Sequence, residues 1–149
     1  MRAVIQRVNS ASVIVEGKTV GRIHKGLVIF LGVVKEDTQA QAIQLAEKVA
    51  ELRIFSDPQR KMNISIKEAA GEVLVVSQFT ICADLDHGRR PSFDRAAEPK
   101  LAEQLYREFI HHLQGLHLKV EEGIFKAYMI VHIENDGPVT FILDTEKGL

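Results

Sequence analysis

The chain has 149 residues, of which 46% are hydrophobic and 26% charged, and these proportions are typical of a single soluble globular domain. Its formal net charge of −1 excludes a protein that coats nucleic acid, because broad phosphate neutralisation requires a clearly basic surface. The sequence contains neither an apolar run of the roughly 20 residues that cross a bilayer nor a secretory signal, so we expect a cytoplasmic protein without a membrane partner.

Strand-like segments alternate with turns in the first third of the chain. Alternating apolar positions predict strands at 3–8 and 12–15, and the Glu16-Gly17-Lys18 turn predicts a hairpin leading to a strand at 19–23. A continuous apolar run follows at 26–34. Its length and β-branched residues predict a central strand that is buried on both faces.

Two amphipathic helices are predicted from their end signals and apolar spacing. Thr38 can act as an N-cap, with Gln41 completing a capping box, for a helix that runs to about Arg53. The second helix begins at Pro99, a residue suited to the first helical position, and ends at Gly115. Its apolar residues recur at helical intervals.

The remaining segments predict strands, two of which have unusual features. A strand at 72–81 turns polar at Ser77, Gln78 and Thr80, and because buried polar groups need partners, it is either an edge or a functional site. Strands are also predicted at 116–121, 127–133 and 137–143. By itself, the Asn135-Asp136-Gly137-Pro138 cluster before the last of them indicates a tight turn with a trans proline.

The order of these elements predicts an α+β (mixed α/β) fold. We expect a single domain over 1–149, with a large, mainly antiparallel sheet or β-barrel-like core, two main helices and a flexible tail at 144–149.

The usual signatures of metal, nucleotide and hydrolase sites are missing from the sequence. Its histidines form no H-E-x-x-H pattern, and the single cysteine, Cys82, has no companion cysteine, so we expect no metal site and no cofactor. The sequence has no phosphate-binding glycine motif and no G-x-S-x-G nucleophile elbow, so a conventional Ser-His-Asp triad is not predicted.

A basic loop at 87–93 is the candidate nucleic-acid contact. His87, Arg89, Arg90 and Phe93 share this loop, although a short charge cluster is more often a solvated turn.

Several motifs, in order, resemble those of the D-aminoacyl-tRNA deacylase family. The resemblance is carried by the segments Ser77-Gln78-Phe79-Thr80, Arg90-Pro91-Ser92-Phe93 and Gly137-Pro138-Val139-Thr140, and it extends from about residue 1 to 144. It implies an enzyme that hydrolyses the ester bond of D-aminoacyl-tRNA, and also of glycyl-tRNA mischarged on tRNA-Ala. Ser77, Gln78, Phe79 and Thr80 are the catalytic segment that it implies.

The resemblance also implies a mechanism and an assembly. Main-chain N–H groups around Phe79 and Thr80 would stabilise the oxyanion, with help from the 2′-hydroxyl of the terminal adenosine. A covalent role for the Thr80 hydroxyl ranks second, because no nearby residue in the sequence can activate it. The protein would be a homodimer in which a cis Gly137-Pro138 peptide enters the partner's site and rejects L-aminoacyl groups by shape.

The partner is therefore expected to be the acceptor end of aminoacyl-tRNA, not DNA. Arg89, Arg90 and Lys35 are the residues that we expect to contact tRNA. Two alternatives remain: a noncatalytic nucleic-acid-binding module, against which the lack of a basic stripe counts, and an editing domain within a larger synthetase complex, against which the lack of a linker counts.

Overall fold

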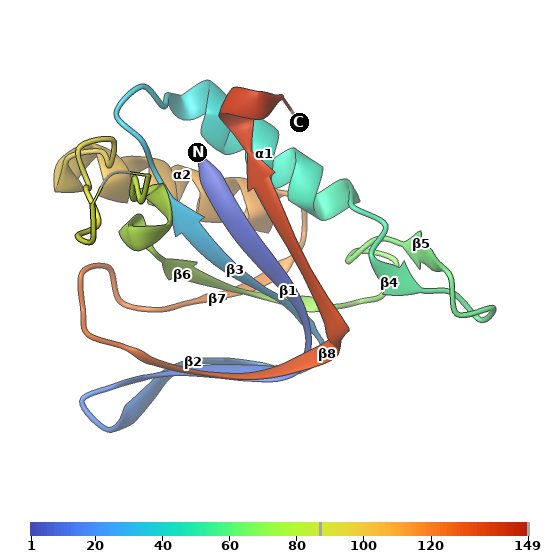
Figure 1. Ribbon diagram of the computed structural model, residues 1–149. Helices are drawn as coiled ribbons and strands as arrows, with labels where there is room; N and C mark the ends of the chain where they lie inside the picture. The colour runs from blue at the N-terminus through green and yellow to red at the C-terminus, as the bar shows by residue number, and fades with distance from the viewer. Residues whose placement is uncertain (87, 149) are drawn as a thin grey trace.

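The computed structural model describes residues 1–86 and 88–148, and its centre is a six-stranded sheet with two helices on one face (Figure 1). The strands follow the order β2-β1-β3-β6-β7, and β8 pairs with β1. Their bounds are β1 Arg2–Val15, β2 Lys18–Ile23, β3 Gly26–Gly32, β6 Glu72–Ser77, β7 Lys119–Glu122 and β8 Ile130–Asp144. The helices are α1, Gln39–Glu51, and α2, Pro99–Gly115, and a separate two-stranded sheet consists of β4, Phe55–Ser56, and β5, Met62–Ile64.

Strand β1 organises the sheet because it pairs with three other strands. Its first half pairs with β3, its second half with β2, and β8 pairs with it from Arg2 to Ile14, all antiparallel. The β3–β6 and β6–β7 pairs are parallel. A Cβ atom at Gly21 of β2 would lie 2.7 Å from the Glu122 carbonyl oxygen of β7, so the two ends of the sheet approach each other and the predicted barrel-like core is confirmed.

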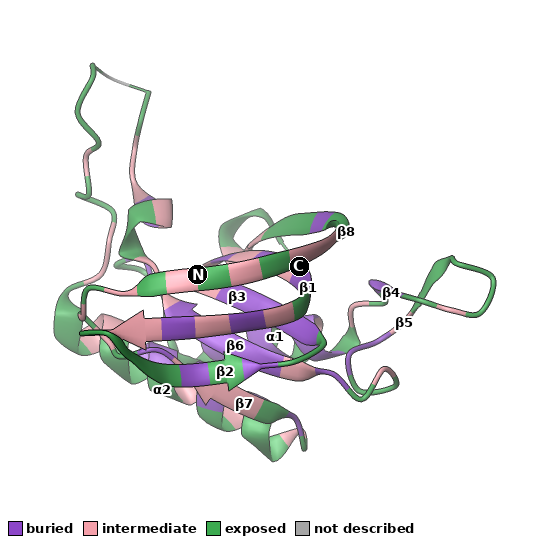
Figure 2. Cartoon of the chain, turned by 90° about the horizontal axis from the view of Figure 1, so that it is seen from below, coloured by how far each residue is buried: buried purple, intermediate pink, exposed green. Residues whose placement is uncertain are grey.

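The two faces of the central strands are buried in separate clusters. On one face, Ile5, Ile29 and Val75 pack with residues of α1 and α2. On the other face, Val28 and Leu74 pack inside the curved sheet with Val13 of β1. Figure 2 shows this burial along β3 and β6. The prediction of a central strand buried on both faces is therefore confirmed for β3.

Both helices and the first hairpin form where their local signals predict them. The Thr38 N–H donates to Gln41 Oε1 at 2.8 Å, which is half of the predicted capping box. Pro99 occupies the first turn of α2, and the helix ends at Gly115. In the hairpin, Glu16 and Gly17 have φ values of 49° and 77°, as a tight turn between twisted strands requires.

Two predictions from the sequence, both about the long strands β1 and β8, are wrong in detail. The segments 3–8 and 12–15 belong to one strand, β1, because it bends and changes partners without breaking. Likewise 130–144 form one strand, β8, so the predicted tight turn at 135–138 is absent from this described part of the chain. In place of a turn, the pairing of β8 with β1 shifts its register between Gln6 and Ser10 of β1.

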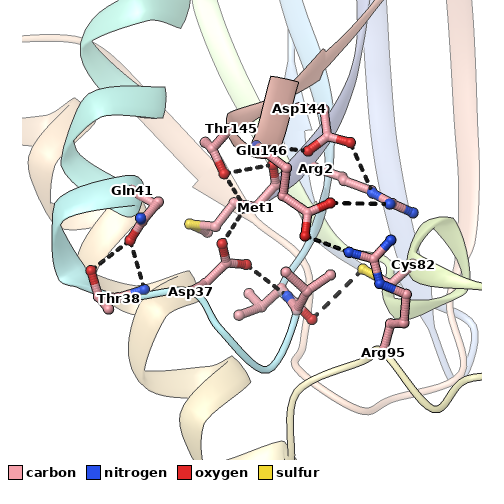
Figure 3. Close-up of polar contacts among 12 residues, drawn as sticks. Met1, Arg2, Asp37, Thr38, Gln41, Cys82, Arg95, Asp144, Thr145 and Glu146 are labelled. Carbon is pink, nitrogen blue, oxygen red and sulfur yellow. Dashed lines mark hydrogen bonds and ion pairs between the residues drawn. The ribbon is translucent and has the colours of Figure 1, made fainter. Parts of the chain in front are cut away.

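The segment that we predict to be a flexible tail, 144–149, makes contacts with the N-terminus. Thr145–Lys147 form a 3₁₀ turn, η2, and the Thr145 N–H donates to the Met1 carbonyl oxygen at 2.9 Å. Ion pairs of Glu146 with Arg2 and Arg95 also hold this turn, and the Met1 ammonium group, which is paired with Asp37, donates a hydrogen bond to the Thr145 hydroxyl (Figure 3). Leu149, the last residue of the predicted tail, lies outside the described residues.

None of the helices within 1–86 and 88–148 is both apolar enough and long enough to span a membrane.

Candidate active site at the end of β6

Strand β6 ends at Ser77 and the chain turns away from the sheet. The predicted strand at 72–81 is therefore wrong beyond this residue: Phe79–Cys82 form a 3₁₀ turn, η1. The physical reason is that the neighbouring strands stop, since β3 ends at Gly32 and the ladder with β7 reaches only Val75. The Gln78 N–H makes the last contact with β3, donating to the Leu31 carbonyl oxygen at 2.8 Å.

Close packing against β3 fixes the position of η1. A Cβ atom at Gly32 would lie 2.7 Å from Cys82 Sγ and 3.1 Å from the Gln78 carbonyl oxygen. Only glycine leaves room for the turn at this point. The amides of Phe79 and Thr80 open η1, where helical N–H groups have no carbonyl partner inside the helix.

A cleft of about 460 Å³ adjoins this turn. Ser77, Gln78 and Phe79 line it, whereas the fourth predicted catalytic residue, Thr80, does not. Thr80 is exposed, and its hydroxyl contacts the Gln78 side-chain amide. The other lining residues come from β3, β6, β8, the first half of α2 and the loops beside these elements: Leu31, Val33, Val76, Ala96, Ala97, Pro99, Ala102, Tyr106, Phe125, Lys126, Ala127, Tyr128, Met129 and Val131.

The cleft is mainly apolar and has few ionisable groups. Among the described residues that line it, there is no histidine, cysteine or carboxylate, and Lys126 is the only charged side chain. The Tyr106 hydroxyl donates to the Val75 carbonyl oxygen at 3.1 Å, and burial raises the pKa of this tyrosine. Burial also raises the pKa of the nearby Cys82 thiol, so that thiol stays protonated at neutral pH. A histidine or carboxylate that could activate the Ser77 hydroxyl as a nucleophile is therefore missing from this described lining.

The second motif that the sequence singles out, Gly137-Pro138, lies within β8. Its peptide bond is cis, as the family resemblance implies, and both residues are exposed. The buried Arg7 side chain lies behind it, with Nε 2.9 Å from Asp136 Oδ2 and Nη1 donating to the Ile54 carbonyl oxygen at 2.8 Å. The motif is thus exposed to solvent on one side and supported by β1 on the other.

The two motifs are not brought together within one chain. Gln78 lies beside Gly32, which pairs with Arg2 at the start of β1. Gly137-Pro138 lies between the pairs Gln6–Thr140 and Val8–Asn135. At the rise of a strand, about 3.3 Å per residue, this separates them by about 15 Å along β1.

The predicted tRNA-contact residues are exposed on or beside one loop. Arg89 and Arg90 belong to the loop between η1 and α2, which projects from the body of the molecule (Figure 2). Asp84 and Ser92 close the loop through two backbone hydrogen bonds, and Lys35 reaches its end by donating its N–H to the Arg95 carbonyl oxygen at 3.1 Å. His87, also in the predicted basic loop, lies outside the described residues.

Several cleft residues were missed from the sequence. The segment 123–129 contributes Phe125, Lys126, Tyr128 and Met129, yet it carries no motif, and the sequence predicts a strand over its second half. Arg7 was also given no role. A charged residue among the alternating buried positions of β1 was the available signal for it.

Comparison with known proteins gives consistent matches over nearly the whole chain. A family model described as D-Tyr-tRNA(Tyr) deacylase matches residues 4–144. A D-aminoacyl-tRNA deacylase of Symbiobacterium thermophilum is 56% identical over 147 residues, covering 99% of this chain and 97% of that protein. The protein of the same name from Thermotoga petrophila is 55% identical over 147 residues, covering 99% of each. A solved structure described as a c-Myc DNA unwinding element binding protein has a TM-score of 0.91 and 39% identity, covering 97% of this chain and 98% of that one.

Proposed function

Because this chain belongs to the D-Tyr-tRNA(Tyr) deacylase family, we propose that it hydrolyses the ester bond of D-aminoacyl-tRNA and releases the free D-amino acid and tRNA. The observation that carries this proposal is the identity of 55–56% to proteins named D-aminoacyl-tRNA deacylase, over 97–99% of both chains. Such an enzyme is a carboxylic ester hydrolase that acts in the cytoplasm, where aminoacyl-tRNA is made and used.

The chemistry of the cleft favours catalysis by the main chain and by the substrate itself. An aminoacyl ester is already activated, so orientation and oxyanion stabilisation can supply much of the rate. The amides of Phe79 and Thr80 at the start of η1 are suited to receive the oxyanion, and the 2′-hydroxyl of the terminal adenosine assists the attack of water. The described lining of the cleft, without a carboxylate or histidine, supports this mechanism over a protein-derived base.

Thr80 provides a test of this mechanism. We expect Thr80→Val to retain deacylation within about a hundredfold of the wild type, because the loss of a covalent nucleophile costs far more than the loss of a hydrogen-bonding hydroxyl. The Thr80 hydroxyl contacts the Gln78 amide, which is not a base. Single-turnover hydrolysis of D-tyrosyl-tRNA measures the effect. A folded Thr80→Val protein with no activity would instead establish the covalent mechanism, and Thr80→Ser serves as the control.

Selection of D-substrates needs a second subunit in this proposal. The protein acts as a homodimer, and Gly137-Pro138 of one subunit enters the cleft of the other. The separation of the two motifs along β1 supports this arrangement, as do the exposure of both residues and the exposed apolar side chains Phe141 and Ile142 on the same strand. The Gly137 and Pro138 carbonyl groups would receive the substrate α-amino group and leave no space for an L side chain.

Glycine has no side chain, so the lack of space beside Gly137-Pro138 cannot exclude a glycyl group. Glycyl-tRNA, including glycine mischarged on tRNA-Ala, is therefore a second expected substrate.

The tRNA contact should be local. Arg89, Arg90 and Lys35 are exposed, but the net charge of the chain is −1, so we expect only about two to four phosphate contacts, each contributing about 0.7 to 0.9 to the slope of log affinity against log salt. An Arg89→Ala/Arg90→Ala double variant should lower that slope by up to about 1.8. Lys67→Ala is the matched control, because Lys67 is exposed and follows β5 in the chain, and Figure 1 shows β5 at the end of the molecule away from the loop between η1 and α2. A wild-type slope typical of a long duplex site would contradict the proposal.

DNA binding is the second candidate function, because the similar solved structure is described as a DNA-binding protein. Incubation of the purified protein with D-tyrosyl-tRNA and L-tyrosyl-tRNA, with duplex DNA as a binding competitor, distinguishes the two. Deacylation of the D form alone supports the proposed function. Binding of DNA without cleavage of either ester would replace it with the second candidate.

A further inference from the structure

The mouth of the cleft carries exposed aromatic side chains. Phe79 is 57% exposed and Tyr128 is 88% exposed, and both line the cleft. Phe93, which is 39% exposed, packs against Phe79 with a distance of 4.9 Å between the ring centroids. Single exposed apolar residues are common on proteins, but aromatic rings gathered at the mouth of one cleft indicate a binding surface.

The segment that bears Tyr128 is anchored by contacts with β6 and α2. The Gly123 N–H donates to the Val75 carbonyl oxygen at 3.1 Å, and the Phe125 ring lies 5.8 Å from the buried Tyr106 ring. From Ile124 onward, the exposed residues alternate with half-buried ones. Lys126 and Tyr128 are therefore presented at the opening while Phe125 anchors the segment.

Two loops bring these groups to the same opening. Phe93 and the cleft residues Ala96 and Ala97 belong to the loop before α2, and Lys126 and Tyr128 to the loop between β7 and β8. In Figure 1 both loops lie at the same end of the molecule, in yellow and orange. The opening thus combines aromatic faces with one cation, and Arg89 and Arg90 belong to the same loop as Phe93.

This combination has the chemistry of a site for single-stranded nucleic acid. Bases stack on aromatic side chains whatever their identity, and nearby cations contact the phosphates. A folded protein surface presents no base faces to Tyr128, and a duplex presents only the outer face of its terminal pair, whereas each unpaired nucleotide can offer its base for stacking. The cleft itself, on the function proposed above, receives the terminal adenosine and its amino acid.

We propose that Tyr128, with Phe79, Phe93 and Lys126, forms a stacking platform for the unpaired nucleotides that precede the terminal adenosine of the acceptor strand. The platform rests on the proposed function for the choice of substrate. It makes Tyr128 a residue that sets affinity for the RNA strand, separate from the groups that act on the ester.

Tyrosine fluorescence offers a direct measurement, because the chain has two tyrosines and no tryptophan. Tyr106 is buried, so quenching by an added base reports mainly on Tyr128. We expect a single-stranded oligoribonucleotide that ends in CCA and carries no amino acid to quench the wild-type emission and to leave that of Tyr128→Leu unchanged. Anisotropy of a labelled oligonucleotide should give a Kd at least about tenfold higher for Tyr128→Leu, and within about threefold of the wild type for Tyr128→Phe.

Two further variants test the surroundings of the platform. Lys126→Gln should lower the slope of log affinity against log salt by about 0.7, the contribution of one contact to a single strand. Ile124→Ala is the matched control: Ile124 belongs to the same segment and is 46% exposed, but it does not line the cleft. Its affinity for the oligonucleotide should equal that of the wild type.

Kinetics separate a role in strand binding from a role at the ester. For Tyr128→Leu, kcat/KM should fall at least about tenfold more on D-tyrosyl-tRNA than on D-tyrosyl-adenosine, which lacks the preceding nucleotides. An equal loss on both substrates would overturn the proposal, and so would wild-type affinity for the oligonucleotide. A change of oligomeric state in Tyr128→Leu, measured by sedimentation, would also overturn it, since a second copy would then cover the ring. The oligonucleotide arm needs no hydrolysis, so it gives an answer even if the proposed esterase activity fails.

Discussion

We expect Gly26→Ala to lower the free energy of unfolding by about 3 kcal/mol or more, the largest stability effect of any glycine substitution in this chain. Gly26 pairs with Glu72 where β3 and β6 begin, and an added Cβ atom would lie 1.8 Å from the Glu72 carbonyl oxygen. The two backbones would have to separate by about an ångström, at the centre of the sheet. Urea denaturation monitored by circular dichroism measures the loss.

The control for this substitution is Gly115→Ala. Gly115 ends α2, and apart from its chain neighbours and the backbone of that helix, a Cβ atom there meets no atom of the described chain within 4 Å. Its stability should be unchanged or slightly higher, because alanine reduces the entropy of the unfolded chain. If Gly26→Ala is recovered only as insoluble protein while Gly115→Ala is soluble, the expectation is met. Equal stability of the two variants would show that β3 and β6 do not approach as closely as described.

The largest effect on activity is expected from Gly137→Ala, on the function proposed above. Gly137 has φ +119°, a conformation that L side chains rarely adopt, and its Cβ atom would lie 2.7 Å from Val139 Cγ2 and 3.3 Å from Arg7 Nη2. Neither neighbour can move freely, because Val139 and Arg7 are both buried. The motif must therefore shift, and a shift of about an ångström at a site of substrate orientation costs about a hundredfold in rate. Steady-state hydrolysis of D-tyrosyl-tRNA measures it.

Gly17→Ala is the matched control for the loss of a glycine at positive φ. Gly17 has φ +77° in the hairpin between β1 and β2, and apart from its two chain neighbours no described residue has an atom within 4 Å of its Cβ position. Both variants carry a comparable backbone cost, of order 1–3 kcal/mol, but only Gly137→Ala should lose activity. Wild-type rates and D-selectivity in a folded Gly137→Ala protein would show that the motif is not part of the proposed site.

Elements with local signals could be predicted from the sequence. The capping box at Thr38 and Gln41, the proline at Pro99 and the turn at Gly17 each act within a few residues, so the sequence near them suffices. The apolar run of β3 was equally informative, because a strand buried on both faces needs no particular partner to be recognised.

The ends of strands depend on partners that are distant in sequence, and here the predictions were wrong. β6 stops at Ser77 because the strands beside it have ended, which no property of 72–81 indicates. β8 continues through Gly137-Pro138 because β1 remains beside it on both sides of the register shift. The candidate site was found through the motifs of a family, whereas Tyr128 and Lys126 reach it only through the path of the loop between β7 and β8.

The pairing of β1 with β8 has a consequence for the newly made protein. Arg2 lies opposite Asp144, so the second-longest strand of the sheet lacks one neighbour until almost the whole described chain has been translated. At 5–20 residues per second, this interval is on the order of ten seconds. An apolar strand with an unpaired edge can pair with another nascent chain during that time. The ribosome-bound intermediate is therefore the state most prone to aggregation, and soluble yield should respond to translation rate and to chaperone supply more than to the stability of the finished fold.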